Sequence, residues 1–249
     1  DNMTREDEVK FQVSDPDLIE QRAKDLGCVL ESETEQVDRY FDYPSFVLSR
    51  HLHGLRIREF HGAPQSCDFK VLFYFPERPN DPWYVDENVS DFPVSRECLV
   101  SIFKRLGISN RSIGEELDPI ELEKVLLGEK LVEAFRITKT RRKYACPEGM
   151  QILFDYVKEL GSFVELEGSH CQAYLSSLGL PEDGRLKRWG YTSLLLESKG
   201  IFNQGNFKPQ FERSHMWNVL PDEVTLYNAI KGGIVDPSQR RSQPHLQTF

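Results

Sequence analysis

Charged residues recur at every second position within several short segments of this chain. In the segment 55–59, for example, Arg56 and Arg58 alternate with the apolar Leu55 and Ile57. A period of two is typical of a β-strand with one apolar and one polar face. The charged positions that share this pattern are Glu6, Glu8, Lys10, Arg56, Arg58, Lys70, Lys139, Arg141, Asp155, Glu165 and Glu167. If the strands belong to one sheet covered by helices on its apolar side, these charges line a common cavity.

Such a cavity would combine two kinds of chemistry. The arginines and lysines are donors that suit phosphate oxygens, and the guanidinium fork matches phosphate geometry. The aspartate and glutamates supply the hard oxygen ligands that Mg²⁺ or Mn²⁺ prefers. Charges of both signs at this density cannot stay buried without partners. A divalent metal ion together with a polyphosphate would satisfy both sets of charges.

The same patterns predict the elements that position these residues. We expect strands over 6–13, 36–42, 55–59, 69–75, 132–143, 151–157 and 163–167. Helices are expected over 16–26, 95–106, 118–127, 169–178 and 192–198, the first two of them followed by a terminating glycine. The stretch 76–93 holds four prolines and is predicted to be a loop or insertion. Together the elements indicate an α+β fold.

Composition excludes several classes of protein. The chain has 249 residues, with Asp+Glu 40 against Lys+Arg 31 and a net charge of −9. Its hydrophobic fraction of 39 % is enough for a sizeable core, so global disorder is excluded. A mean hydropathy of −0.50 and the lack of an apolar run of about 18 residues argue against a membrane span. The acidic balance argues against a nucleic-acid polymer as partner.

The five cysteines are scattered and form no CxxC pair: Cys28, Cys67, Cys98, Cys146 and Cys171. This pattern predicts neither a disulfide framework nor a zinc site, and we expect Cys28 and Cys67 to be small core residues. Reduced thiols are typical of an intracellular protein. We therefore expect a cytoplasmic location.

Taken in their order along the chain, these residues resemble a known family. The run Glu6-Asp7-Glu8-Val9-Lys10 resembles the ExExK motif of the CYTH superfamily, which contains class IV adenylyl cyclases and thiamine triphosphatases and belongs to the triphosphate tunnel metalloenzymes. The resemblance covers about residues 6–198, and Tyr191 with the following leucines resembles the family's closing helix. The resemblance also includes, in family order, the segments 36–42 and 55–58, Lys70, the segment 139–141, Asp155 and the segment 160–167.

The resemblance implies a fold and a role for each residue. The fold would be a closed or nearly closed tunnel of eight antiparallel β-strands with helices packed outside. Lys70 and Tyr40 would be catalytic, with Tyr40 approaching Lys70 to help position a water. The triphosphate clamp would be Lys10, Arg56, Arg58, Lys70, Lys139 and Arg141. The ligands of Mg²⁺ or Mn²⁺ would be Glu6, Glu8, Asp155, Glu165 and Glu167.

The chain also departs from a compact family member. We expect residues 1–200 to form the tunnel domain, with insertions at about 76–93 and 108–130. Residues 201–249 are rich in Asn, Gln, Gly and Pro and are expected to be a partly disordered C-terminal extension that could contact another protein.

Three functions fit these expectations. The first is a metal-dependent triphosphatase that hydrolyses a small triphosphate, such as tripolyphosphate, thiamine triphosphate or ATP. The second is a class IV-type adenylyl cyclase that converts ATP to cyclic AMP and pyrophosphate. The third is a non-catalytic module that binds polyphosphate or nucleotides. The intact carboxylate set favours an enzyme over a binding module, because binding alone needs the cations more than the metals.

Overall fold

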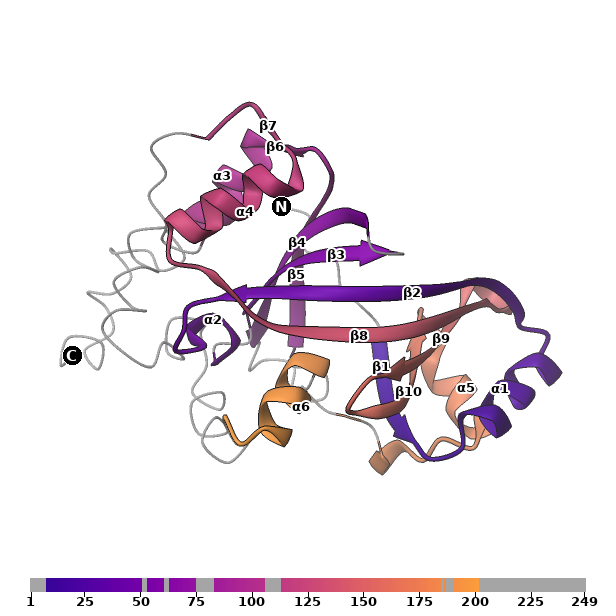
Figure 1. Cartoon of the computed structure of the whole chain (residues 1–249). Coiled ribbons are helices and arrows are strands. Elements are labelled where there is room, and N and C mark those ends of the chain that lie inside the picture. Colours follow the sequence, from indigo (N-terminus) through magenta and orange to yellow (C-terminus); the bar gives the residue numbers. More distant parts are fainter. Residues whose placement is uncertain are drawn as a thin grey trace, which may run out of the picture.

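The computed structural model describes residues 8–50, 53–60, 63–74, 83–105, 113–184, 186 and 190–201. Its main element is an eight-stranded antiparallel sheet in the order β1-β10-β9-β8-β2-β3-β4-β5 (Figure 1). The strands are β1 (Glu8–Val13), β2 (Val29–Asp42), β3 (His53–Phe60), β4 (Ala63–Tyr74), β5 (Trp83–Asp91), β8 (Val132–Ala145), β9 (Gln151–Val157) and β10 (Gly161–Glu167). A short second sheet pairs β6 (Val94–Ser95) with β7 (Glu116–Leu117). The α+β class with a large antiparallel sheet is therefore confirmed.

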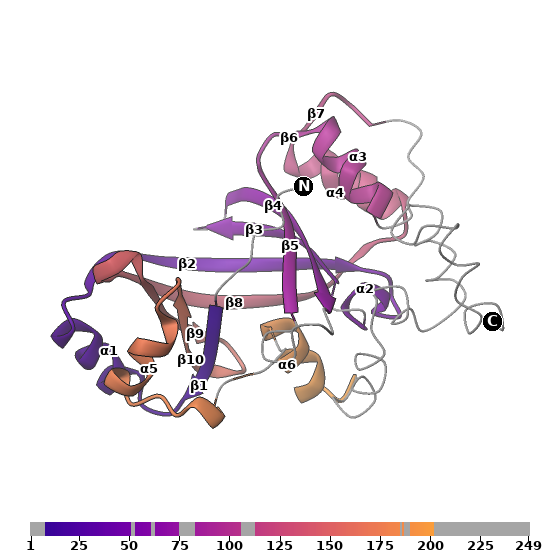
Figure 2. The ribbon, with the colours of Figure 1, turned by 180° about the vertical axis from the view of Figure 1, so that it is seen from behind.

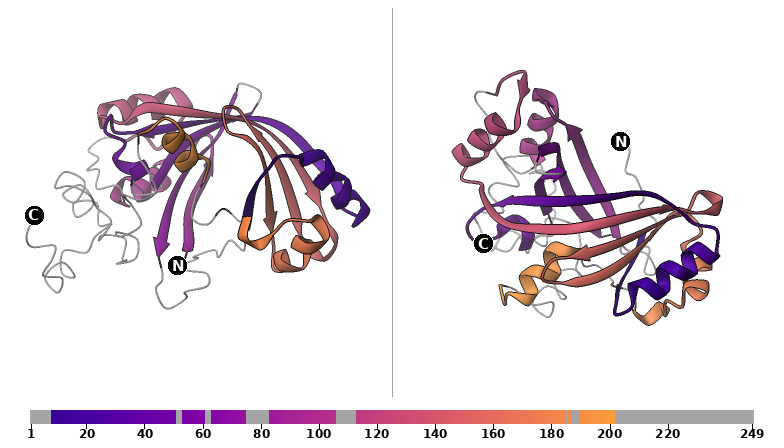
Figure 3. Two further views of the ribbon diagram at one scale, coloured as in Figure 1. Left: turned by 90° about the horizontal axis from the view of Figure 1, so that it is seen from below. Right: turned by 45° about the vertical axis from the view of Figure 1, so that its right-hand side comes forward.

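The long strands β2 and β8 pair over most of their length and form the middle of the sheet. Figure 3 shows the sheet bent into an arch, with β3, β4 and β5 in one arm and β1, β9 and β10 in the other. Such curvature follows from the twist of paired strands. It brings the same face of distant strands toward a common space.

Two groups of helices cover the other face of the sheet. Helices α1 (Pro16–Asp25) and α5 (Cys171–Leu178) pack on the β1 arm, where Phe11, Phe154 and Val164 are buried. Helices α3 (Arg96–Arg105) and α4 (Pro119–Gly128) pack near β2 and β3, over Phe41 and Ile57. Figure 2 shows these two groups from behind. The short α2 (Val47–Arg50) and the 3₁₀ turns η1 (Pro147–Gly149) and η2 (Glu182–Gly184) connect the elements.

The helix starts follow the capping residues of the sequence. The side chain of Asp15 accepts a hydrogen bond from the backbone N–H of Leu18 at 3.1 Å, and proline follows at the first position of α1. Asp118 and Glu121 form a reciprocal capping box at the start of α4. These predicted starts are confirmed. None of the helices in the described part of the chain is long and apolar enough to span a membrane.

The predicted tunnel is not confirmed, because the sheet is open. Within the described residues, the edge strands β1 and β5 do not pair with each other. Part of the free edge of β1 is occupied by another segment, since the Lys10 carbonyl accepts a hydrogen bond from the Leu186 N–H at 2.8 Å.

Two further expectations were wrong. The stretch 76–93 was expected to be a loop, but β5 (Trp83–Asp91) lies within it and pairs with β4. Cys28 is buried in the core, as expected, but it forms a disulfide with Cys146 across 118 residues of sequence, although neither was expected to be paired. They meet because Val29 of β2 pairs with Ala145 of β8, which places their chain neighbours side by side. The side chain of Cys67 lies outside the described part of the chain. Cys98 and Cys171 are free thiols, but the disulfide weakens the argument from reduced cysteines, and the cytoplasmic location stays a prediction.

Candidate functional site

Those charged residues predicted from alternation that belong to the described strands lie on one face of the sheet. Directly opposed residues in an antiparallel pair point to the same side. Lys10 lies opposite Glu165, Arg141 opposite Asp155, and Tyr40 opposite Arg56. This face is the one that helices α1, α3, α4 and α5 do not cover, and we call it the charged face.

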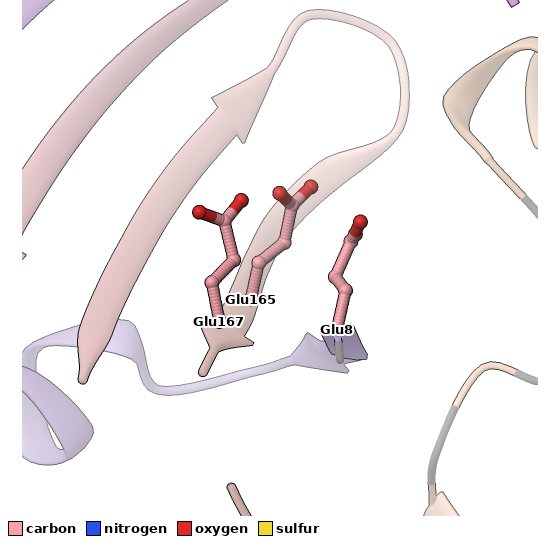
Figure 4. A group of neighbouring side chains, drawn as sticks. All are labelled: Glu8, Glu165 and Glu167. Carbon is pink, nitrogen blue, oxygen red and sulfur yellow. The ribbon is translucent and has the colours of Figure 1, made fainter. Parts of the chain in front are cut away.

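Three carboxylates of the charged face gather at the β1 end. Glu8 lies on β1, while Glu165 and Glu167 lie on β10, and one oxygen from each lies within 4.8 Å of the others. Figure 4 shows the three side chains rising from their strands to the same side. Mg²⁺ in proteins is held by a small number of carboxylate oxygens, with water in the remaining positions. The donor set and its spacing therefore fit a hard divalent cation.

Basic side chains surround Glu165. The Lys10 ammonium lies 2.8 Å from Glu165 and 3.2 Å from Glu8, and the Arg141 guanidinium donates to Glu165 at 3.0 Å. Burial works to lower the pKa of Lys10, but Glu165 and Glu8 outweigh it and raise that pKa above its ordinary value. Burial works to raise the pKa of Glu165, but Lys10 and Arg141 hold it well below its usual range. Glu165 is therefore an anion fixed among cations.

Asp155 lies deeper in the same face and is 2 % exposed. Arg141 donates to it through Nε at 2.7 Å, and the Lys139 ammonium lies 3.5 Å away. Burial, together with the neighbouring Arg141, lowers the pKa of Lys139 to about 7. Lys139 is thus a cation whose charge an additional anion at the site would stabilise.

Arg56 and Arg58 of β3 form a second basic group, with Asp38 of β2 between them. Arg58 donates through Nε and Nη2 at 2.6 and 2.8 Å, and Arg56 donates at 3.1 Å. Asp38 is 1 % exposed. Burial works to raise its pKa, but Arg56 and Arg58 hold the pKa of Asp38 below its usual range. Sequence reasoning did not assign Asp38 to the site, although it alternates with Tyr40 and register would place it opposite Arg58.

A residue from outside the sheet completes the charged face. Tyr191 lies at the start of α6 (Tyr191–Ser198), which packs on this face against Ile137, Val157 and Phe163. Its hydroxyl is 2.8 Å from Asp155 Oδ2 and 2.7 Å from Glu165 Oε1. Burial and the charge of Glu165 raise the pKa of Tyr191, so the phenol stays protonated. The sequence indicated only a closing helix here, because nothing local to Tyr191 reveals partners on β9 and β10.

The structure does not describe the side chains of two predicted site residues, Glu6 and Lys70. Glu6 lies outside the described residues. The backbone of Lys70 lies on β4 opposite Gly54 and Glu87, but its side chain lies outside the described part of the chain. The ring of Tyr40 stacks on that of Phe135 with centroids 4.9 Å apart. The predicted approach of Tyr40 to Lys70 therefore stays a prediction.

Comparison with known proteins identifies the family. Residues 4–171, more than half of the chain, match the model of the CYTH domain. The chain belongs to the CYTH domain family. The resemblance predicted from the motifs is thereby confirmed. No curated protein matches the chain.

Solved structures share the fold of this CYTH protein. The PH1819 protein of Pyrococcus horikoshii OT3 is 21 % identical, with a TM-score of 0.55, over 78 % of this chain and 99 % of that one. A candidate adenylate cyclase of Vibrio parahaemolyticus is 16 % identical, with a TM-score of 0.54, over 77 % and 98 %. The adenylyl cyclase candidate HpAC1 of Hippeastrum, described as having a dominant triphosphatase activity, is 16 % identical, with a TM-score of 0.51, over 80 % and 98 %.

Proposed function

We propose that this CYTH protein is a divalent-metal-dependent triphosphatase that hydrolyses a small triphosphate on its charged face. The observation that carries the proposal is the gathering of Glu8, Glu165 and Glu167 within 4.8 Å, beside the cations Lys10 and Arg141. A cluster of carboxylates alone could be an ordinary patch of polar surface. Carboxylates that share one face with five described cations suit a ligand that brings both metal and phosphate.

The arrangement divides the work between two parts of the sheet. Glu8, Glu165 and Glu167 would hold Mg²⁺ or Mn²⁺, and the predicted ligands Glu6 and Asp155 would adjoin them. When bound, the metal would polarise phosphoryl oxygens and neutralise the charge that develops on them. Arg56 and Arg58 would bind phosphate oxygens through their guanidinium N–H groups.

The remaining cations would hold the chain of phosphates between these two parts. Lys10, Lys139 and Arg141 pair with carboxylates and would turn N–H groups toward phosphate oxygens. In the tunnel that the family implies, Lys70 would join this clamp, and Tyr40 with Lys70 would orient the attacking water. Their position in the reaction remains part of the proposal.

Adenylyl cyclase activity is the second candidate for the same site. It would use the same metal and cations, with the 3′-hydroxyl of ATP in place of water as nucleophile. The Hippeastrum protein, similar in fold, is described as a cyclase candidate with dominant triphosphatase activity, which supports hydrolysis as the first choice. A binding module without catalysis accounts less well for three converging carboxylates.

Product identification separates these functions. The purified protein is incubated with tripolyphosphate, thiamine triphosphate or ATP, each with Mg²⁺, Mn²⁺ or EDTA. We expect metal-dependent release of orthophosphate from at least one substrate. Cyclic AMP and pyrophosphate from ATP, without orthophosphate, would instead establish the cyclase. Binding of all three substrates with no product would establish the binding module.

A further inference from the structure

Helix α6 brings one polar group into the charged face. Tyr191 is 7 % exposed and packs edge-on against Phe163, with ring centroids 4.9 Å apart. Leu195, one turn further along α6, is buried with Ile137 and Val157. The helix lies beyond residues 4–171, which match the family model. Its apolar contacts explain why α6 sits on the sheet, but not why a hydroxyl points at two buried carboxylates.

The Tyr191 hydroxyl completes the set of donors around Glu165. Glu165 Oε1 receives it at 2.7 Å and the Lys10 ammonium at 2.8 Å, while Oε2 receives Arg141 at 3.0 Å. The side chain of Glu165 is 5 % exposed, whereas that of Glu8 is 25 % exposed. Groups from β1, β8 and α6 therefore hold one carboxylate of the candidate metal site in a fixed orientation. The single phenolic proton is shared with Asp155, which ties the two carboxylates together.

We propose that Tyr191 is a positioning residue for the metal site: its hydroxyl orients Glu165 so that the oxygens of Glu8, Glu165 and Glu167 face one divalent cation. This inference rests on the proposed function, because it concerns the same metal. Groups that hydrogen-bond to a metal's ligands commonly change metal affinity by about 10- to 100-fold when they are removed. Tyr191 would act through Glu165 and Asp155 rather than by touching the ion.

The aromatic ring of Tyr191 has a separate role. It lies 4.3 Å from the Lys10 ammonium and 5.2 Å from the Lys139 ammonium, measured to the ring centroid. Such contacts stabilise the cations whether or not the ring bears a hydroxyl. A phenylalanine at this position would therefore keep the cations in place and lose only the hydrogen bonds to the carboxylates.

The test compares Tyr191→Phe with Tyr144→Phe. Tyr144 is also buried and also donates to a carboxylate, Glu20, but on the helix-covered face of the sheet. Binding of Mn²⁺ is measured without substrate from the electron paramagnetic resonance signal of the free ion. Binding of tripolyphosphate is measured without metal by calorimetry. We expect Tyr191→Phe to weaken Mn²⁺ binding about tenfold and to leave tripolyphosphate binding unchanged. We expect Tyr144→Phe to change neither.

The outcomes separate this inference from the proposed function. Equal Mn²⁺ affinity in Tyr191→Phe and the wild type would overturn the positioning role while leaving the metal site intact. A parallel loss of Mn²⁺ and tripolyphosphate binding, or an equal loss in Tyr144→Phe, would indicate general loosening of the fold and would also overturn it. A wild-type protein that binds no Mn²⁺ would contradict the proposed function itself. Far-UV circular dichroism checks that each variant is folded.

Discussion

Replacement of Asp38 by asparagine should destabilise the protein in a way that depends on pH. Asp38 is 1 % exposed and receives three hydrogen bonds from Arg56 and Arg58, so the neutral amide would remove the negative charge with which both largely buried guanidiniums pair. Breaking a buried ion pair by removing one partner costs about 3–5 kcal/mol. The arginine side chains keep 10 % and 16 % exposure, so the lower end, about 3 kcal/mol, applies. For a chain of this size, that loss lowers Tm by roughly 6–12 °C.

The pH dependence follows from the lowered pKa of folded Asp38. The pKa of an unfolded aspartate is about 3.9, above the pKa of folded Asp38, so the stabilisation is fully present above about pH 3.9. It is lost as the pH falls toward the folded pKa. Urea unfolding of the wild type and of Asp38→Asn should therefore differ at neutral pH and converge in acid.

Asp42 provides a control, because its pKa is shifted in the opposite direction to that of Asp38. It is also buried but accepts from backbone N–H groups and from Ser49, and burial raises its pKa. Acidification should therefore not reduce the deficit of Asp42→Asn. A deficit of Asp38→Asn that is below about 1 kcal/mol, or that does not shrink in acid, would refute the assigned pairing with Arg56 and Arg58.

Two other variants test the framework that holds the charged face. Arg39 is 12 % exposed and pairs with Glu59 of β3, Glu123 of α4 and Glu133 of β8, so it joins α4 to the sheet. Arg39→Met should therefore lower the free energy of unfolding by about 2 kcal/mol and speed hydrogen exchange in residues 119–128. Unchanged exchange in α4 would contradict this. Removing the disulfide with Cys28→Ala and Cys146→Ala should cost about 2–5 kcal/mol, because the bond closes a long loop. Failure to find the linked peptide by non-reducing mass spectrometry would refute the pairing itself.

The charged face could be predicted because it depends on local alternation. A period of two assigns Arg56 and Arg58 to one side of a strand whatever the neighbouring strand is, and the caps at Asp15 and Asp118 depend only on residues three positions away. Family order added which strands belong together. For these reasons, Lys10, Glu165 and Asp155 could be assigned to one site before their distances were known.

The rest depends on contacts between distant segments. The prolines of 76–93 led to the prediction of a loop where β5 forms, because the pairing of β5 with β4 overrides the local turn signals. The disulfide follows from the register of β2 against β8, which no cysteine spacing encodes. Tyr191 reaches Asp155 and Glu165 only because α6 folds back across the sheet. The sheet is open because its edge strands β1 and β5 do not pair within the described residues, and alternation along single strands does not address the pairing of edges.

The most direct test of the central claim is the release of orthophosphate from tripolyphosphate by Glu165→Gln/Glu167→Gln. The matched control is Glu20→Gln, another buried carboxylate, which pairs with Arg142 on the helix-covered face. With Mg²⁺ or Mn²⁺ present, we expect the double variant to lose activity by about 100-fold or more while Glu20→Gln stays active. Metal-dependent hydrolysis that survives in the folded double variant would contradict the assignment of the charged face as the metal and triphosphate site.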